Sequence, residues 1–221
     1  INFLQFKSAF KRRMNNEPIS KIFNEKEFWS FNFFVNQFVL DPRPESEFLI
    51  QTIKEYYNNL QSNLKICDLG TGSGCLAVTL AKIYNNSKIT ATDISKEAII
   101  IAKKNAKKHY VEKQIKFIYC DWFTTSEQFD LVVSNPPYLS YKQYEKCNIN
   151  IKNFEPKIAL VAGKDGLESY RNISNIASSI LHKNSFLFIE IGKSQTINIK
   201  NIFLHKNIEL IKIVKDYQQI N

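Results

Sequence analysis

From Lys65 onward, short apolar runs alternate with longer stretches that are apolar on one side only. Runs rich in β-branched residues predict strands, and apolar residues at helical spacing predict helices. Strands are expected at Lys65–Leu69, Lys88–Asp93, Ile115–Cys120, Asp130–Ser134, Ser185–Ile191 and Ile208–Val214. Helices are expected at Gly74–Tyr84, Lys96–His109, Gly166–Leu181 and Ser194–Phe203. This alternation predicts an α/β fold with a mostly parallel sheet covered on both faces.

The first part of the chain has a different pattern. Ile1–Met14 carries apolar residues at near-helical spacing, which predicts a short amphipathic helix, and a turn follows at Asn15–Pro18. The aromatic-rich stretch Phe28–Val39 predicts a hairpin. After the stiff segment Asp41–Glu45, a helix is expected over Ser46–Tyr57.

One long segment and the two ends break the alternation. Ser140–Phe154 is polar and without periodicity, which predicts a long irregular loop of the kind that often carries function. The chain begins with Ile1 instead of Met and ends at Asn221, just after a predicted strand whose hairpin partner would normally follow. These ends suggest a piece of a longer polypeptide that lacks its last strand.

A length of 221 residues predicts one main core with a small appendage. No apolar run is long enough for a membrane span and no signal peptide is recognisable, so we expect a cytoplasmic protein without membrane contact. The cysteines Cys67, Cys75, Cys120 and Cys147 show no CxxC spacing. We therefore expect reduced structural thiols and no metal site.

The formal net charge of +9 raises the possibility of a nucleic-acid partner. Nearly all of the cations are lysines, however, and pairs such as Lys103-Lys104 and Lys107-Lys108 share one predicted helix. Such lysines are most simply a solvated face, and an acidic protein partner would suit the charge equally well. A nucleic acid is therefore not the expected substrate.

A glycine-rich motif, Asp68-Leu69-Gly70-Thr71-Gly72-Ser73-Gly74, follows the first parallel strand and opens a helix. Glycine allows a sharp turn and a close approach to a ligand, and the amides at the helix start can hold a carboxylate. A dinucleotide site would have the spacing G-x-G-x-x-G, where this chain has Cys75 in place of the last glycine. The spacing favours S-adenosylmethionine over NAD.

Polar residues at the ends of the next two strands would complete this cofactor site. Asp93 can accept hydrogen bonds from ribose hydroxyls; alternatively it caps the following helix, a role that Ser95 could also fill. Asp121 and Trp122 could hold an adenine ring, or Trp122 could be a core residue.

A second motif, Asn135-Pro136-Pro137-Tyr138, ends the strand Asp130–Ser134. Its chemistry suits a planar nitrogen that is a poor nucleophile, because the Asn135 side-chain oxygen and the Pro136 carbonyl can accept its hydrogens and favour charge on nitrogen during methyl transfer. Tyr138 offers a face for stacking. The motif alone does not separate a glutamine amide from the amino group of adenine or cytosine.

The chain resembles the HemK/PrmC family of peptide chain release factor N5-glutamine methyltransferases over nearly its whole length. Besides the two motifs, the matching segments are Glu17-Pro18-Ile19, Glu27-Phe28-Trp29, Pro42 to Glu47, Asp121-Trp122-Phe123, Phe154-Glu155-Pro156, Ala159-Leu160, Asp165-Gly166-Leu167 and Glu190-Ile191-Gly192. Pro42-Arg43-Pro44-Glu45 is the most specific of them, since related ribosomal-protein enzymes resemble Pro-Arg-Ser-Pro there and DNA adenine enzymes lack the segment.

The resemblance implies a class I methyltransferase fold and transfer of a methyl group from S-adenosylmethionine to the glutamine of the Gly-Gly-Gln motif in release factors, leaving S-adenosylhomocysteine. It implies that Gly70, Thr71, Gly72, Ser73, Gly74, Asp93, Trp122 and Asn135 bind the cofactor. Asn135, Pro136, Pro137 and Tyr138 would bind the glutamine, with Asn135, Pro136 and Tyr138 as catalytic residues.

Two departures from the family pattern stand out. Asp41 occupies a place that is usually apolar, and the N-terminal helical domain is nearly absent. We therefore expect residues 1–45 to be a remnant of that domain with a connecting hairpin, and residues 46–221 to form the methyltransferase domain. An N6-adenine methyltransferase and a cofactor-binding module of a larger fused protein are the alternatives.

Overall fold

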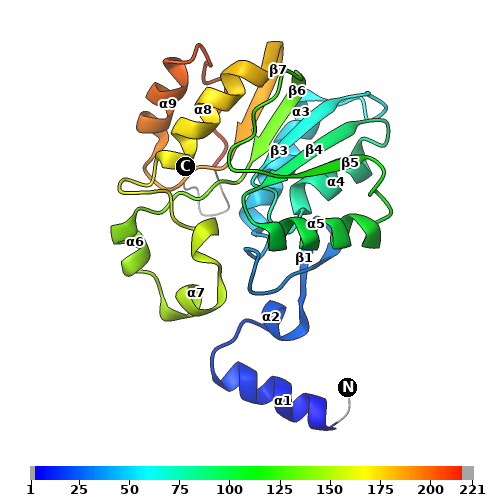
Figure 1. Cartoon of the computed structure of the whole chain (residues 1–221), viewed down its shortest axis with the longest axis vertical. Coiled ribbons are helices and arrows are strands. Elements are labelled where there is room, and N and C mark those ends of the chain that lie inside the picture. Colours follow the sequence, from blue (N-terminus) through cyan, green and yellow to red (C-terminus); the bar gives the residue numbers. More distant parts are fainter. Residues whose placement is uncertain (1–2, 216–221) are drawn as a thin grey trace.

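A five-stranded parallel sheet forms the centre of the computed structural model, which describes residues 3–215 (Figure 1). The strands lie in the order β5-β4-β3-β6-β7. Their bounds are β3 Lys65–Leu69, β4 Lys88–Asp93, β5 Ile115–Tyr119, β6 Phe129–Ser134 and β7 Leu181–Ile189. Each pair of neighbours is parallel, so the carboxyl ends of all the strands reach the same edge of the sheet.

Helices cover both faces of this sheet. Their bounds are α3 Glu47–Tyr56, α4 Cys75–Ile83, α5 Lys96–Lys108, α8 Glu168–Ile180 and α9 Thr196–Leu204. The two faces can be followed on β3, where Ile66 packs in one core with α3 and α4, and its neighbour Cys67 packs in a second core with α8 and α9. The alternation of strands and helices therefore predicted the layers correctly.

The N-terminal part forms a helix pair and a hairpin. Its elements are α1 Phe3–Met14, α2 Ile19–Phe23, β1 Glu25–Phe28 and β2 Phe31–Phe34, followed by the 3-10 helix η1 Pro44–Ser46. The expected first helix is confirmed from Phe3 onward, and residues 1–2 lie outside the described part. α1 extends away from the sheet and buries none of its side chains (Figure 1). The hairpin is also confirmed, but it begins earlier than predicted, and the spacing analysis did not find α2.

The expected loop over Ser140–Phe154 was wrong. This segment forms two short helices, α6 Tyr141–Glu145 and α7 Ile149–Phe154, and the 3-10 helix η2 Lys157–Ala159 follows. Ser140 starts α6 with a capping box, since its Oγ accepts from the Gln143 amide and the Gln143 side chain accepts from the Ser140 amide. Side-chain caps thus stabilise helices that apolar periodicity did not predict.

The expected strand at Ile208–Val214 was also wrong. No residue of this segment pairs with a described strand, and several of its apolar side chains are exposed, including Ile211 at 65%. An alternating pattern shows which residues could share a face, but a strand forms only where a neighbour supplies the hydrogen bonds. Within residues 3–215, no helix has both the length and the apolar character needed to cross a membrane.

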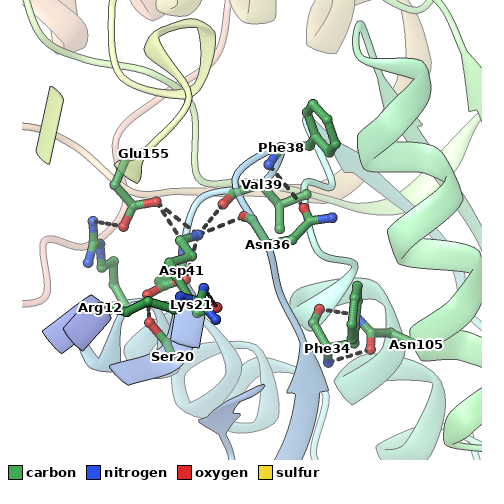
Figure 2. A network of polar contacts seen from close by, with 11 residues as sticks. Arg12, Ser20, Lys21, Phe34, Asn36, Phe38, Val39, Asp41, Asn105 and Glu155 are labelled. Atoms are coloured by element: carbon green, nitrogen blue, oxygen red, sulfur yellow. Dashed lines mark hydrogen bonds and ion pairs between the residues drawn. The ribbon is translucent and has the colours of Figure 1, made fainter. Parts of the chain in front are cut away.

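A buried cluster of charges joins α2 to the segment before α3 (Figure 2). The Lys21 Nζ lies 2.7 Å from Asp41 Oδ1 and 3.3 Å from Glu155 Oε2, and all three side chains are almost fully buried. Lys21 also donates to the Asn36 and Val39 carbonyls at 2.8 and 2.7 Å. Asp41, the departure from the family pattern, is therefore the counter-ion of a buried lysine.

Lys21→Met should destabilise the protein by about 3–5 kcal/mol, because Asp41 and Glu155 would lose their buried counter-ion. Adding Asp41→Leu should recover part of this loss, since an apolar pair needs no compensation. Urea unfolding measures both variants. Lys108→Met is the control, because Lys108 pairs with Glu25 at the surface and such pairs contribute about 1 kcal/mol or less. Equal losses at Lys21 and Lys108 would contradict the role of the buried cluster.

Candidate active site

The two motifs lie side by side at the carboxyl edge of the sheet. β3 leads into the glycine motif, β6 leads into Asn135-Pro136-Pro137-Tyr138, and these strands are direct neighbours. Their ladder reaches the pair Asp68 and Val133, and one step further the Ser134 Oγ donates to the Leu69 carbonyl at 2.6 Å. Ser134 is fully buried, so this bond fixes the two motifs relative to each other.

The glycine loop has the backbone conformation that only glycine adopts readily. The φ angles of Gly70, Gly72 and Gly74 are +76°, +55° and +81°. A Cβ at Gly70 or Gly72 would meet no atom within 4 Å, so the backbone there borders open space. A Cβ at Gly74 would lie 3.1 Å from Ala102, which shows that this glycine allows α4 to pack against α5.

Asp93 supports the loop from the end of β4. Its carboxylate accepts from the Gly72 amide at 2.8 Å and from the Ser95 amide at 2.9 Å. Burial raises the pKa of Asp93, against the effect of these hydrogen bonds. Ser95, and not Asp93, caps α5, because its Oγ accepts from the Ala98 amide at 3.1 Å. Ser95 therefore has the capping role that was the alternative interpretation of Asp93.

A second support comes from the hairpin side. The Asn105 side chain, fully buried on α5, accepts from the Phe34 amide at 2.7 Å and donates to the Phe34 carbonyl at 2.9 Å (Figure 2). The same amide nitrogen donates to the Ser73 carbonyl at 2.8 Å. The hairpin thus holds the glycine loop through one side chain, a long-range contact that no local sequence pattern predicts.

A cavity of about 410 Å³ opens in front of the glycine loop. The predicted site residues on its walls are Gly70, Thr71, Ser73, Asp93, Trp122, Asn135 and Pro137. Gly72 and Gly74 are not among its lining residues; the Gly72 amide is held by Asp93, and Gly74 packs against α5. Trp122 is 36% exposed and has a φ of +44°, so its ring belongs to the cavity rim and not to the core.

Asp68 lies under the loop with no exposed surface. Its Oδ2 accepts from the Thr71 hydroxyl at 2.7 Å, whereas Oδ1 has no hydrogen-bond partner among the described residues. Burial raises the pKa of Asp68 to about 7, with the neighbouring Asp93 charge adding to the shift. Because burial disfavours its charged form, Asp68 supports the loop through Thr71 and does not itself line the cavity.

The second motif borders both this cavity and a larger groove of about 1860 Å³. Asn135, Pro136 and Tyr138 line the groove, and Asn135 also lines the cavity. The Tyr138 carbonyl accepts from the Gln195 side chain at 3.0 Å, which fixes the backbone after the two prolines. Arg43, paired with Glu155 at 3.0 Å, lies on the walls of both hollows as well.

Ser46 and Glu190 belong to the site, although the motif analysis gave them no role. Asn135 Nδ2 donates to Ser46 Oγ at 2.8 Å, and Ser46 Oγ donates to Glu190 Oε2 at 2.6 Å. Burial raises the pKa of Glu190 above its ordinary value. Glu190 directly follows β7, and a polar residue at the carboxyl end of a buried parallel strand is the signal that could have found it.

Comparison with known proteins identifies the family of this chain. A family model described as "Methyltransferase small domain" matches residues 40–154. A release factor glutamine methyltransferase from Buchnera aphidicola is 38% identical over 217 residues, which cover 98% of this chain and 77% of that protein. The chain belongs to the release factor glutamine methyltransferase family. The resemblance found in the sequence is therefore confirmed.

Relatives of two other kinds extend the comparison. A bifunctional methyltransferase from Rickettsia bellii is 38% identical over 252 residues, covering 100% of this chain but 45% of that protein, so the chain spans about half the length of such relatives. A solved methyltransferase from Pyrococcus furiosus has a TM-score of 0.57 at 18% identity and covers 90% of this chain and 86% of that chain. The latter shows the fold alone, and the class I methyltransferase fold is thereby confirmed.

The raised pKa of Asp68 predicts how the stability of the protein depends on pH. A carboxyl group whose folded pKa lies above the unfolded value near 3.8 favours folding while it is protonated, and this contribution is lost as the pH rises through about 7. Asp68→Asn cannot ionise. Its stability relative to the unsubstituted chain should therefore increase from pH 5 to pH 8, by about 1 kcal/mol or more, in urea unfolding without ligand.

Asp165→Asn is the matched control. A hydrogen bond from Arg171 lowers the pKa of Asp165, so its contribution is present above the unfolded pKa and is lost only as the pH falls below that value. The stability difference caused by Asp165→Asn should therefore stay constant between pH 5 and pH 8. A constant difference for Asp68→Asn as well would contradict the buried, ionising Asp68.

Proposed function

We propose that this chain transfers a methyl group from S-adenosylmethionine to the N5 side-chain amide nitrogen of the glutamine in the Gly-Gly-Gln motif of release factors. The observation that carries the proposal is the position of Asn135, which borders both the cavity beside the glycine loop and the larger groove. A group bound in the cavity and a group bound in the groove would meet at this side chain. Membership of the family supplies the substrate class.

The residues around the cavity fit S-adenosylmethionine, which supplies a methyl group activated by its positive sulfur. Gly70 lines the cavity with backbone that borders open space, where a Cβ would otherwise intrude. Asp93, on the cavity wall, would present a carboxylate toward the bound ligand. Gly70 to Gly74 would receive the amino-acid end, Asp93 the ribose hydroxyls, and Trp122 the adenine ring, with Asn135 next to the reacting end.

Asn135 and Pro136 would activate the glutamine amide. The lone pair of an amide nitrogen is delocalised, so the nitrogen is a poor nucleophile. Two acceptors that bind its hydrogens, the Asn135 Oδ1 and the Pro136 carbonyl, would return electron density to it and stabilise the positive charge that develops as the methyl group passes from sulfur to nitrogen. The methylated nitrogen is strongly acidic and would lose one of its protons to solvent. Pro137 stiffens the backbone, and Tyr138 would stack on the planar amide. Pro136 is buried and the Tyr138 carbonyl is held by Gln195, so this arrangement is preorganised.

Release factors would accordingly be the protein partners, and the cytoplasm, where translation takes place, would be the location. A nucleobase substrate is less well supported, because the lysines of α5 form an exposed helix face in which Lys108 pairs with Glu25. Lys104 lies over the Phe34 ring in the same face. These contacts are those of a solvated surface.

We expect labelled S-adenosylmethionine to transfer its methyl group to a release factor and not to the same factor with Gln→Ala in its Gly-Gly-Gln motif. Duplex DNA, assayed in parallel, should remain unlabelled. Transfer should also tolerate added salt, since a DNA enzyme would lose affinity with a steep, phosphate-counting slope. Labelling of DNA without labelling of the release factor would replace the proposed substrate by a nucleobase.

Asn135→Ala should lower the rate of methyl transfer about a hundredfold or more, because one preorganised acceptor is removed. Asn135→Asp keeps an acceptor but adds a charge, so it should keep only part of the activity. Single-turnover rates at saturating cofactor separate this effect from weaker cofactor binding. Asn175→Ala, the same substitution on the exposed side of α8, is the control and should leave the rate unchanged. A near-normal rate for Asn135→Ala would mean that the motif has a structural role.

A further inference from the structure

A chain of hydrogen bonds holds the Asn135 amide by its NH₂ end, with Ser46 on the wall of the cavity and Glu190 on the wall of the groove. The Asn135 Nδ2 donates to Ser46 Oγ at 2.8 Å, and Ser46 Oγ in turn donates to Glu190 Oε2 at 2.6 Å. Asn135 follows β6, Ser46 ends η1, and Glu190 follows β7. Three separate parts of the chain therefore converge on one amide.

The two outer members are themselves held in place. Ser46 is 2% exposed, and its amide donates to the Arg43 carbonyl at 3.0 Å within the Pro42-Arg43-Pro44-Glu45 segment. The Glu190 amide donates to the Ser134 carbonyl at 3.0 Å, and the Tyr170 hydroxyl donates to the Glu190 carbonyl at 3.2 Å. These bonds fix the two backbones from which the side chains extend, and burial limits the space in which the Ser46 side chain can rotate.

The direction of the chain decides which end of the Asn135 amide faces the substrate. A serine hydroxyl has one proton, and that of Ser46 is given to the Glu190 carboxylate. Only lone pairs of Ser46 remain for Asn135, so Asn135 must present its NH₂ group there. The two ends of a planar amide point apart, and the Asn135 Oδ1 is consequently turned away from Ser46.

The charge of Glu190 also strengthens the Asn135 oxygen as a hydrogen-bond acceptor. A carboxylate that accepts from a hydroxyl makes the hydroxyl oxygen a stronger acceptor, and the effect continues along a hydrogen-bonded chain. A stronger bond to the Asn135 NH₂ group places more negative charge on the amide oxygen. That oxygen is the atom assigned above to the amide hydrogens of the substrate.

We propose that Ser46 and Glu190 are positioning residues that hold the Asn135 amide with its oxygen toward the substrate and strengthen that oxygen as an acceptor. The inference rests on the proposed function for its effect on turnover, but the orientation of Asn135 is a property of the protein alone. The two parts can therefore be tested separately.

The first test is independent of any substrate. In protein labelled with ¹⁵N-asparagine, the side-chain NH₂ signal of Asn135 is identified by its loss in Asn135→Ala. Ser46→Ala should shift this signal and speed its exchange with water, because the acceptor is gone. Ser46→Thr keeps the hydroxyl and should leave the signal close to its original position. An unchanged Asn135 signal in Ser46→Ala would overturn the proposal, whatever the enzyme methylates.

The second test uses methyl transfer to the release factor. Ser46→Ala should lower the single-turnover rate about tenfold or more at saturating cofactor, and Glu190→Gln, which keeps an acceptor but loses the charge, should lower it less. Ser46→Thr should recover most of the rate. Ser179→Ala removes a helix hydroxyl that donates to the Ile176 carbonyl. This variant is the control and should leave the rate of methyl transfer unchanged.

A double-mutant cycle separates positioning from a general structural effect. If Ser46 and Glu190 act through Asn135, adding Ser46→Ala or Glu190→Gln to Asn135→Ala should change the remaining rate by less than about twofold. A full additional loss in that background would overturn the proposal. If the unsubstituted chain leaves the release factor unlabelled, the proposed function fails, and the NMR result then decides the positioning role by itself.

Discussion

The hydrogen bond between the Ser134 hydroxyl and the Leu69 carbonyl determines the geometry on which the rest of the site depends. β3 and β6 stop pairing at Asp68 and Val133, and beyond that point the two backbones separate into different loops. The buried Ser134 side chain extends the contact by one residue, at the place where each motif begins. The hydrogen bonds from the Gly72 amide to Asp93 and from Gln195 to the Tyr138 carbonyl act further along these loops, whose starting points Ser134 has already fixed.

The sheet and the two motifs could be predicted from the sequence because both depend on local patterns. The bounds of β3 and β4 agree with the expected ranges, and in each strand all residues between the ends are buried, as expected for a central parallel strand. A parallel order then places all the carboxyl ends at one edge, so Gly70 and Asn135 had to lie near each other. Trp122 at the cavity rim follows from the same rule.

The remaining features depend on contacts between distant parts of the chain. Nothing near Ser46 in the sequence indicates that it meets Glu190, and nothing near Lys21 indicates Asp41 as its counter-ion. Helices α6 and α7 depend on side-chain caps, where the analysis relied on apolar spacing. The segment Ile208–Val214 shows the opposite error, because its alternating pattern is real but no described strand pairs with it.

The absence of that pairing has a practical consequence for β7. With no described neighbour beyond it, Leu181–Ile189 is the edge of the sheet, and its outward N–H and C=O groups form a template to which another extended chain can add. Lys183, Asn184 and Ser185 interrupt the apolar character near its start, and Phe186, Leu187 and Phe188 follow. Because Glu190 directly follows β7, an extended chain added along this edge would lie beside the residue that accepts from Ser46, so the unpaired edge and the site are neighbours.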